Sequence, residues 1–236
     1  MSTQHIASAF DRDLDGAQAM VMKMAGLVQE AMVQAAEALE TSDLTKADAV
    51  RKNDKTIDAL DESIKIDCAR ILATRSPTAS DLRRVLSVMS ISSNLERCGD
   101  YAKNIAKRTT VLAQSTPVDG VSSALRNMQN AVVAMIKDAL DAYIQRDLEK
   151  AEEVRARDRD VDEMYNMLFR TLLTHMMEDS HKITACMHLH FIAKNIERMG
   201  DHTTAIAEQV IYLVTGELPD EDRPKNDQTS ISTEGQ

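Results

Sequence analysis

The segment NLERCGDYAKNIA, residues 94–106, recurs as NIERMGDHTTAIA at residues 195–207, with 7 of 13 positions identical. A second pair of segments lies upstream: DLTKADAVRKNDKTID, residues 43–58, matches DLEKAEEVRARDRDVD, residues 147–162, at 8 of 16 positions. The two offsets, 101 and 104 residues, are nearly equal, so the same order of segments occurs twice. Because a repeat of this kind determines the architecture, the chain is interpreted as a tandem duplication.

Each copy of the repeat predicts three long helices. From Phe10 to Leu39, apolar residues recur every three or four positions, which is the spacing of one helix face. Pro77 and the stretch 115–120 interrupt the pattern, because proline and glycine favour helix ends and turns. The first predicted helix ends near residue 41, and the others span about 43–75, 79–113, 121–145, 147–177 and 180–215, with Ser180 as a cap.

These helices predict an all-α fold of two tandem three-helix bundles related by internal duplication, at residues 5–114 and 121–216. Helices of this length are rods of roughly 45 Å, so we expect two elongated bundles lying side by side. The 7 glycines, 4 prolines and 3% aromatic residues argue against the many short strands of a β-sandwich or barrel. Residues 217–236 are mostly polar and without periodicity, which predicts a disordered tail.

Composition also limits the partners and the compartment. The formal net charge of −10 argues against nucleic-acid binding, which depends on lysine and arginine neutralising phosphates. No segment has the roughly 20 apolar residues that span a bilayer, and the first residues do not read as a secretory signal. We therefore expect a soluble cytoplasmic protein with no transmembrane segment. The three cysteines, Cys68, Cys98 and Cys186, are interpreted as buried, reduced thiols.

Four pairs of acidic residues, each four positions apart, stand at matching places in the two copies. On a helix this spacing places both carboxylates on one face, where their charges repel each other. The pair on each third helix continues an apolar stripe, so these carboxylates are expected to be partly removed from water and to need a compensating partner. The pairs are Asp54 with Asp58, Glu96 with Asp100, Asp158 with Asp162, and Glu197 with Asp201.

Two interpretations of these carboxylates stay open. Oxygen donors from two neighbouring helices suit hard cations, which predicts sites for Mg, Mn, Ca or Fe, with Zn as a further possibility. Alternatively, the carboxylates form a structural network with nearby arginines, of which the obvious ones are Arg51, Arg97, Arg155 and Arg198. Gly99 and Gly200, one residue before the last acid of each pair, predict close helix packing more than room for a ligand.

Motifs for catalysis are weak in this sequence. His188 and His190 have no counterpart in the first copy and are interpreted as packed or surface histidines. Glu178 and His181 form a single ExxH motif, whereas a di-iron bundle needs two. The sequence contains no glycine-rich phosphate loop and no nucleophile elbow. We therefore expect a protein that is not an enzyme, with a metal-dependent carboxylate-bundle enzyme or a metal store as the alternative.

The two D-x-x-x-D segments, the two N-[LI]-E-R-x-G-D segments, PTASDLR from Pro77 and MMEDS from Met176 together resemble the PhoU family of phosphate-specific transport system accessory proteins. The resemblance covers about residues 5–216. It implies a cytoplasmic negative regulator of the phosphate-starvation (Pho) regulon and of phosphate homeostasis. Such a protein would be an adaptor in two-component signalling, between the ATPase subunit of a phosphate-uptake ABC transporter and a phosphate-sensing histidine kinase. The resemblance further implies a homodimer.

The resemblance also implies metal binding at the repeated carboxylates. The first copy has Cys98 where the family usually has an aliphatic residue, a difference that concerns packing more than ligation. His188 and His190 are outside the family motif and inherit no role. The implied metal ligands are Asp54, Asp58, Glu96 and Asp100 in the first copy and Asp158, Asp162, Glu197 and Asp201 in the second.

Overall fold

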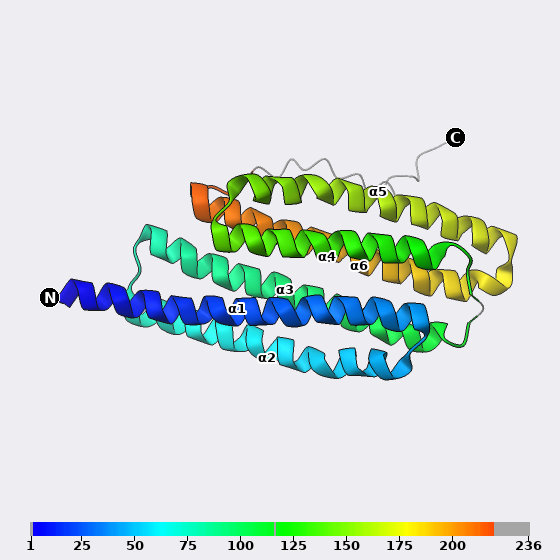
Figure 1. Ribbon diagram of the computed structural model, residues 1–236, viewed down its shortest axis with the longest axis horizontal. Coiled ribbons are helices and arrows are strands. Elements are labelled where there is room, and N and C mark those ends of the chain that lie inside the picture. Colours follow the sequence, from blue (N-terminus) through cyan, green and yellow to red (C-terminus); the bar gives the residue numbers. More distant parts are fainter. Residues whose placement is uncertain (1, 116, 220–236) are drawn as a thin grey trace.

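The computed structural model describes residues 2–115 and 117–219, with side chains from residue 9 onward. Within these ranges the chain forms six α-helices and one short 3₁₀ turn, and no strand (Figure 1). The all-α prediction is therefore confirmed. The elements are α1 (Ser2–Thr41), α2 (Leu44–Arg75), α3 (Ala79–Leu112), α4 (Val121–Gln145), α5 (Leu148–Glu178), η1 (Ser180–Lys182) and α6 (Ile183–Thr215).

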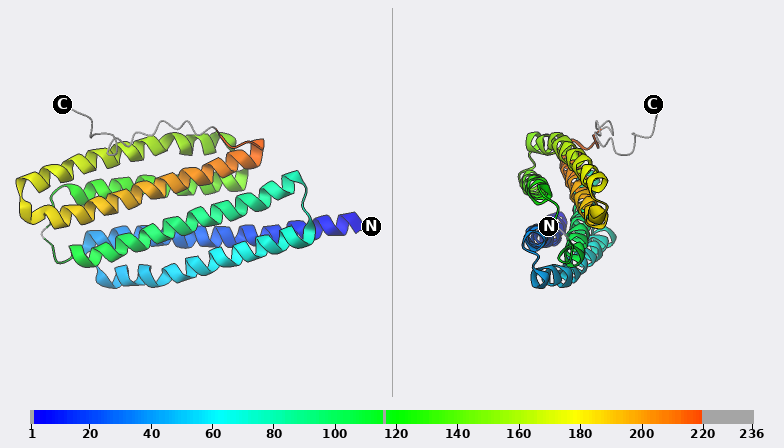
Figure 2. Two further views of the ribbon diagram at one scale, coloured as in Figure 1. Left: turned by 180° about the vertical axis from the view of Figure 1, so that it is seen from behind. Right: turned by 90° about the vertical axis from the view of Figure 1, so that its right-hand side faces the viewer.

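The six helices form two elongated three-helix bundles that lie side by side, as predicted (Figures 1 and 2). Helices α1, α2 and α3 pack on one another, as do α4, α5 and α6. The third helices, α3 and α6, also pack extensively against each other, and α1 contacts α4. The duplicated helices thus form one continuous structure, with α3 and α6 at its centre.

Matching residues begin the second helix of each bundle. The Asp43 carboxylate accepts hydrogen bonds from the backbone N–H groups of Thr45 and Lys46, and Asp147 accepts one from Lys150. Both are typical N-cap contacts, which satisfy N–H groups that have no partner inside the helix. The predicted cap at Ser180 is wrong. The carboxylate of Asp179 accepts from His181 N–H instead, and it starts the η1 turn that precedes α6.

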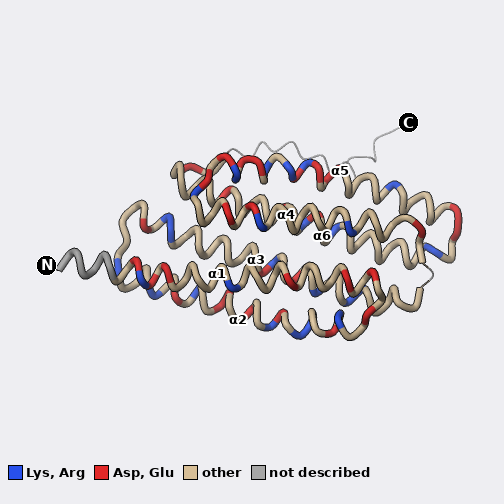
Figure 3. The backbone as a smooth tube through the Cα atoms, viewed as in Figure 1, with Lys and Arg blue, Asp and Glu red and all other residues tan. Residues whose placement is uncertain are grey.

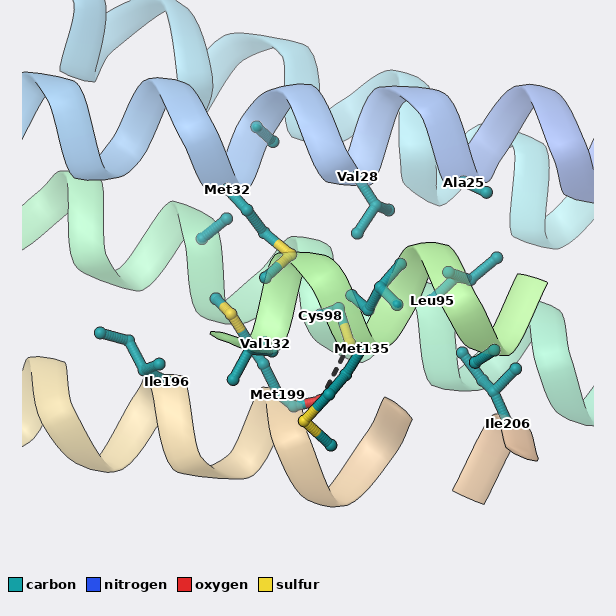
Figure 4. Packing of buried hydrophobic residues seen from close by; sticks show 14 of the residues in the cluster. Ala25, Val28, Met32, Leu95, Cys98, Val132, Met135, Ile196, Met199 and Ile206 are labelled. Carbon is teal, nitrogen blue, oxygen red and sulfur yellow. Dashed lines mark hydrogen bonds between the residues drawn. The ribbon is translucent and has the colours of Figure 1, made fainter. Parts of the chain in front are cut away.

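One cluster of buried apolar residues runs through both bundles. Figure 4 shows its central part, where Val28 and Met32 of α1 face Leu95 of α3 and the side chains of α4 and α6. The Cys98 thiol of α3 donates a 3.9 Å hydrogen bond to the backbone oxygen of Met199 of α6. The core therefore joins the two copies as well as the helices of each.

The three cysteines are buried and free, as the sequence predicts. Burial raises the pKa of the Cys68 thiol to about 11 and that of Cys98 to about 12. Of the predicted disordered tail, residues 220–236 lie outside the described residues. None of the helices described is long and apolar enough to cross a membrane.

Candidate functional site

The first group of repeated carboxylates lies between α2 and α3. Asp54 of α2 is buried, with only 4% of its surface exposed. Lys103 of α3 donates one hydrogen bond to Asp54 Oδ2, at 2.5 Å, and another to Asp100 Oδ1, at 2.8 Å. Arg97 lies farther away, with Nε 3.6 Å from Glu96 Oε2 and Nη1 3.5 Å from Asp100 Oδ2. A lysine ammonium group therefore joins carboxylates of two helices.

The pKa values of this group show that its charges interact. Desolvation, reinforced by the neighbouring Asp54 carboxylate, raises the pKa of Asp58. Desolvation and the nearby Asp100 raise the pKa of Glu96 in the same way. Burial opposes the charge of Lys103, but its hydrogen bonds to Asp100 and Asp54 outweigh this effect and raise its pKa. Such shifts are expected where burial and neighbouring carboxylates disfavour the ionised form of an acid and hydrogen bonds to carboxylates favour the charged form of a lysine.

Asp61 is a member of this group that the repeat comparison missed. Its side chain is buried, and it accepts hydrogen bonds from Ser92 Oγ at 2.8 Å and Lys65 Nζ at 2.6 Å. The second copy has Tyr165 at the matching position, so a search for shared residues passes over it. The signal that could have found it is helical spacing, because Asp54, Asp58 and Asp61 recur every three or four residues along one face of α2.

The second group of carboxylates lies between α5 and α6. Asp162 and Glu197 are buried, and Lys194 Nζ donates a 2.8 Å hydrogen bond to Glu197 Oε1. Burial, only partly opposed by Lys194, raises the pKa of Glu197 to about 7, and the charges of Asp201 and Asp162 contribute. Asp158 reaches the same helix junction, since its Oδ1 is 3.2 Å from where a Cβ on Gly200 would lie. The structure thus brings the carboxylates of each copy together.

The donor chemistry of both groups fits a hard cation. Asp54 Oδ1 and Glu197 Oε2 are buried and have no hydrogen-bond partner in the described part of the chain. Desolvated carboxylate oxygens are costly without a partner, and oxygen donors are what Mg²⁺, Ca²⁺ and Mn²⁺ prefer. As the side chains stand, however, no three Asp, Glu, His or Cys residues among those described converge on one point. Metal ligation by the eight carboxylates therefore stays a prediction.

The expected arginine partners are only partly right. Arg97 lies beside Glu96 and Asp100, but Arg51 pairs with Asp48 and Arg155 pairs with Glu152 and Glu208. The shortest contacts from a cation to the repeated carboxylates come from lysines of the third helices, Lys103 to Asp54 and Asp100 and Lys194 to Glu197. Charged residues as a whole are spread along both bundles (Figure 3). Proximity in sequence could not give the contact of Lys103 with Asp54, because the flexible lysine side chain crosses from α3 to α2.

The two histidines are packed away from the repeated motif, as interpreted from the sequence. The ring of His190 lies 5.1 to 5.9 Å from the rings of Tyr165, Phe169 and Phe191. His188 Nδ1 accepts a 3.1 Å hydrogen bond from Arg108 Nη1, and burial lowers the pKa of His188, as does the nearby arginine charge.

Gly99 lets α2 approach α3 beside the first group, which is the close packing predicted. A Cβ at position 99 would lie 3.1 Å from Ile57 Cδ1 and 3.2 Å from Ile57 Cγ2. At Gly26 on α1, by contrast, a Cβ would meet nothing within 4 Å. The first and third helices of the bundle thus offer one open glycine, Gly26, and one crowded glycine, Gly99, for comparison.

Replacing each glycine by alanine should have different results. Gly26→Ala should raise the free energy of unfolding by about 1 kcal/mol, through helix propensity. Gly99→Ala should be less stable than Gly26→Ala by about 1 to 3 kcal/mol, because the methyl group crowds the stiff Ile57 side chain. Urea unfolding of both variants measures the difference. Equal stabilisation by both substitutions would contradict the close approach at Gly99.

The fold and these groups define a class: an all-α protein of two repeated three-helix bundles, each with a carboxylate cluster between its second and third helices. The PhoU domain family matches the chain twice, at residues 21–109 and 125–210. The chain belongs to the PhoU family. The two matches fall on the two copies of the repeat and support the tandem duplication.

Named relatives and solved structures agree with this assignment. A phosphate-specific transport system accessory protein PhoU homolog of Rhizobium meliloti is 42% identical over 98% of this chain and 97% of its own length. A homolog of the same name from Zymomonas mobilis is 46% identical over 94% of each chain. The crystal structure of PhoU from Pseudomonas aeruginosa superimposes with a TM-score of 0.85 at 36% identity, covering 88% of this chain and all of the other.

Proposed function

We propose that this protein is a non-enzymatic regulatory adaptor of phosphate uptake. It holds the phosphate-starvation regulon off when phosphate is plentiful. The observation that carries the proposal is the family membership over both bundles. The named relatives are phosphate-specific transport system accessory proteins, and a structure from Streptococcus pneumoniae with a TM-score of 0.83 is a phosphate transport system regulatory protein.

The proposed partners are the ATPase subunit of a phosphate-uptake ABC transporter and a phosphate-sensing histidine kinase. Two parallel bundles offer two long helical surfaces, which suits a protein that contacts two partners at once. We place the protein in the cytoplasm, where both of these partners expose their catalytic domains, and we propose that it acts as a homodimer.

We further propose that the repeated carboxylates bind hard cations. Asp54, Asp58, Glu96 and Asp100 would hold ions between α2 and α3. Asp158, Asp162, Glu197 and Asp201 would do the same between α5 and α6. A bound cation would neutralise the repulsion within each group and tie the two helices together, without taking part in turnover. The buried, unpartnered oxygens of Asp54 and Glu197 support this role.

Deleting the gene should switch on phosphate-starvation genes in phosphate-rich medium, since the proposed negative regulation of the kinase is lost. A phosphate-starvation promoter fused to a reporter measures the effect in the deletion strain, the parent and the complemented strain. Expression should rise in the deletion strain and return to the parental level on complementation. Unchanged expression after deletion would rule out the proposed negative regulation.

A further inference from the structure

A lysine ammonium group contacts the carboxylates in both copies, although the two lysines are not equivalent in the repeat. Lys103 follows Asp100 by three residues, and its counterpart in the second copy is Thr204. Lys194 precedes Glu197 by three residues, and its counterpart in the first copy is Ser93. The carboxylates are shared by the duplicated segments, whereas the cations are not. A lysine thus contacts at least one of the repeated carboxylates in each copy, from a different position of the repeat.

In the first group the lysine lies between the helices. Its ammonium nitrogen is 2.5 Å from Asp54 Oδ2 on α2 and 2.8 Å from Asp100 Oδ1 on α3. The Lys103 side chain is 24% exposed and that of Asp54 only 5%, so this contact is more shielded from water than a surface ion pair. It is the kind of position, bridging carboxylates of two helices, that a metal ion would need.

Lys103 leaves part of the first group of carboxylates without a hydrogen-bond partner. Asp54 Oδ1 is buried and makes no hydrogen bond to any residue that the structure describes. The two carboxylate contacts of Lys103 go to Asp54 Oδ2 and Asp100 Oδ1, and Asp58 and Glu96 belong to the same group. Lys103 and the more distant Arg97 therefore bring two positive charges to four carboxylates, and a divalent ion in place of the ammonium group supplies one more charge and more coordination positions.

We propose that Lys103 is the resident counter-ion of the first carboxylate group and that a divalent cation binds there only when the ammonium group leaves. This inference rests on the proposed cation binding. The two positive charges compete for Asp54 and Asp100, since both cannot lie between the same oxygens. Lys103 thus sets the affinity of the first group for metal, and it stabilises the bundle when metal is absent.

The test compares Mn²⁺ binding by the full-length protein and three variants. Lys103→Met removes the charge and keeps the length of the side chain, whereas Lys103→Arg keeps the charge. Lys107→Met changes an exposed lysine one turn farther along the same helix and serves as the matched control. Free Mn²⁺ is measured by electron paramagnetic resonance during titration. Lys103→Gln, which keeps a hydrogen-bond donor, replaces Lys103→Met if the latter does not fold.

Without the competing charge, Lys103→Met should bind Mn²⁺ at least about tenfold more tightly than the parent. Lys103→Arg and Lys107→Met should match the parent. Adding Asp54→Asn to Lys103→Met should abolish the gain in Mn²⁺ affinity. This result would assign the gain to the first group of carboxylates. In EDTA, the melting temperature of Lys103→Met should lie below that of Lys107→Met. Excess Mn²⁺ should remove this difference in melting temperature.

Each contrary outcome has a distinct meaning. Equal Mn²⁺ dissociation constants for the parent and Lys103→Met would overturn the competition while leaving cation binding intact. A gain in Lys107→Met as large as that in Lys103→Met would also overturn it, because general surface charge would then be the cause. If neither the parent nor any variant binds Mn²⁺, both the competition and the proposed cation sites fail, whereas the regulatory proposal is still decided by the reporter strain.

Discussion

Leu95→Ala should lower the free energy of unfolding by roughly 3 to 5 kcal/mol, the upper range for truncating a fully buried leucine. Leu95 lies on α3 and has no exposed surface. It is part of the cluster that α1, α3, α4 and α6 share, shown in Figure 4. Because helices pack on both sides of Leu95, the surrounding side chains can relax little into the cavity. Most of the lost contact energy should therefore appear as a lower free energy of unfolding.

The measurement is urea unfolding followed by circular dichroism, with Leu86→Ala as the matched control. Leu86 lies on the same helix but is 40% exposed, so its truncation should cost about 1 kcal/mol or less. Because the core around Leu95 joins both bundles, the Leu95→Ala variant should still unfold in a single transition at lower urea. A similar loss for both variants, or separate transitions of the two bundles, would contradict the shared core.

Most of the fold could be predicted because its signals are local and repeated. The spacing from Phe10 to Leu39 and the breaks at Pro77 and Gly120 fixed the helices to within a few residues of their ends. The error at Ser180 has a physical cause. A serine and an aspartate stood side by side, and only the backbone conformation decides which of them is the cap. Asp179 has the extended conformation that a cap requires.

The acids of the candidate site could be predicted, and so could Arg97 beside Glu96 and Asp100, but the lysines that contact these acids could not. The eight carboxylates are shared by the two copies, so comparing the copies finds them. Lys103, Lys194 and Asp61 occur in one copy each, so the same comparison passes over them. Their roles depend on which helix faces which, and on how far a long side chain reaches across the junction. Such contacts are set by tertiary packing.

Neutralising the carboxylates one group at a time should remove bound metal one group at a time. After loading with excess Mn²⁺ and gel filtration, the variant Glu96→Gln with Asp100→Asn should lose the metal of the first group and keep that of the second. Glu197→Gln with Asp201→Asn should do the reverse, and the combination of all four should retain none. The reason is geometric: the carboxylates of each group lie on the second and third helices of one bundle, so neither group would share a ligand with the other.

Elemental analysis of each purified variant measures the metal content. The matched control is Glu149→Gln with Glu153→Gln, an exposed acidic pair with the same four-residue spacing on α5. If general negative charge attracts the ions, this control should lose as much metal as either group variant. If the repeated carboxylates are the ligands, it should keep the parental content. Equal metal in the parent and the four-fold variant would refute ligation at these positions.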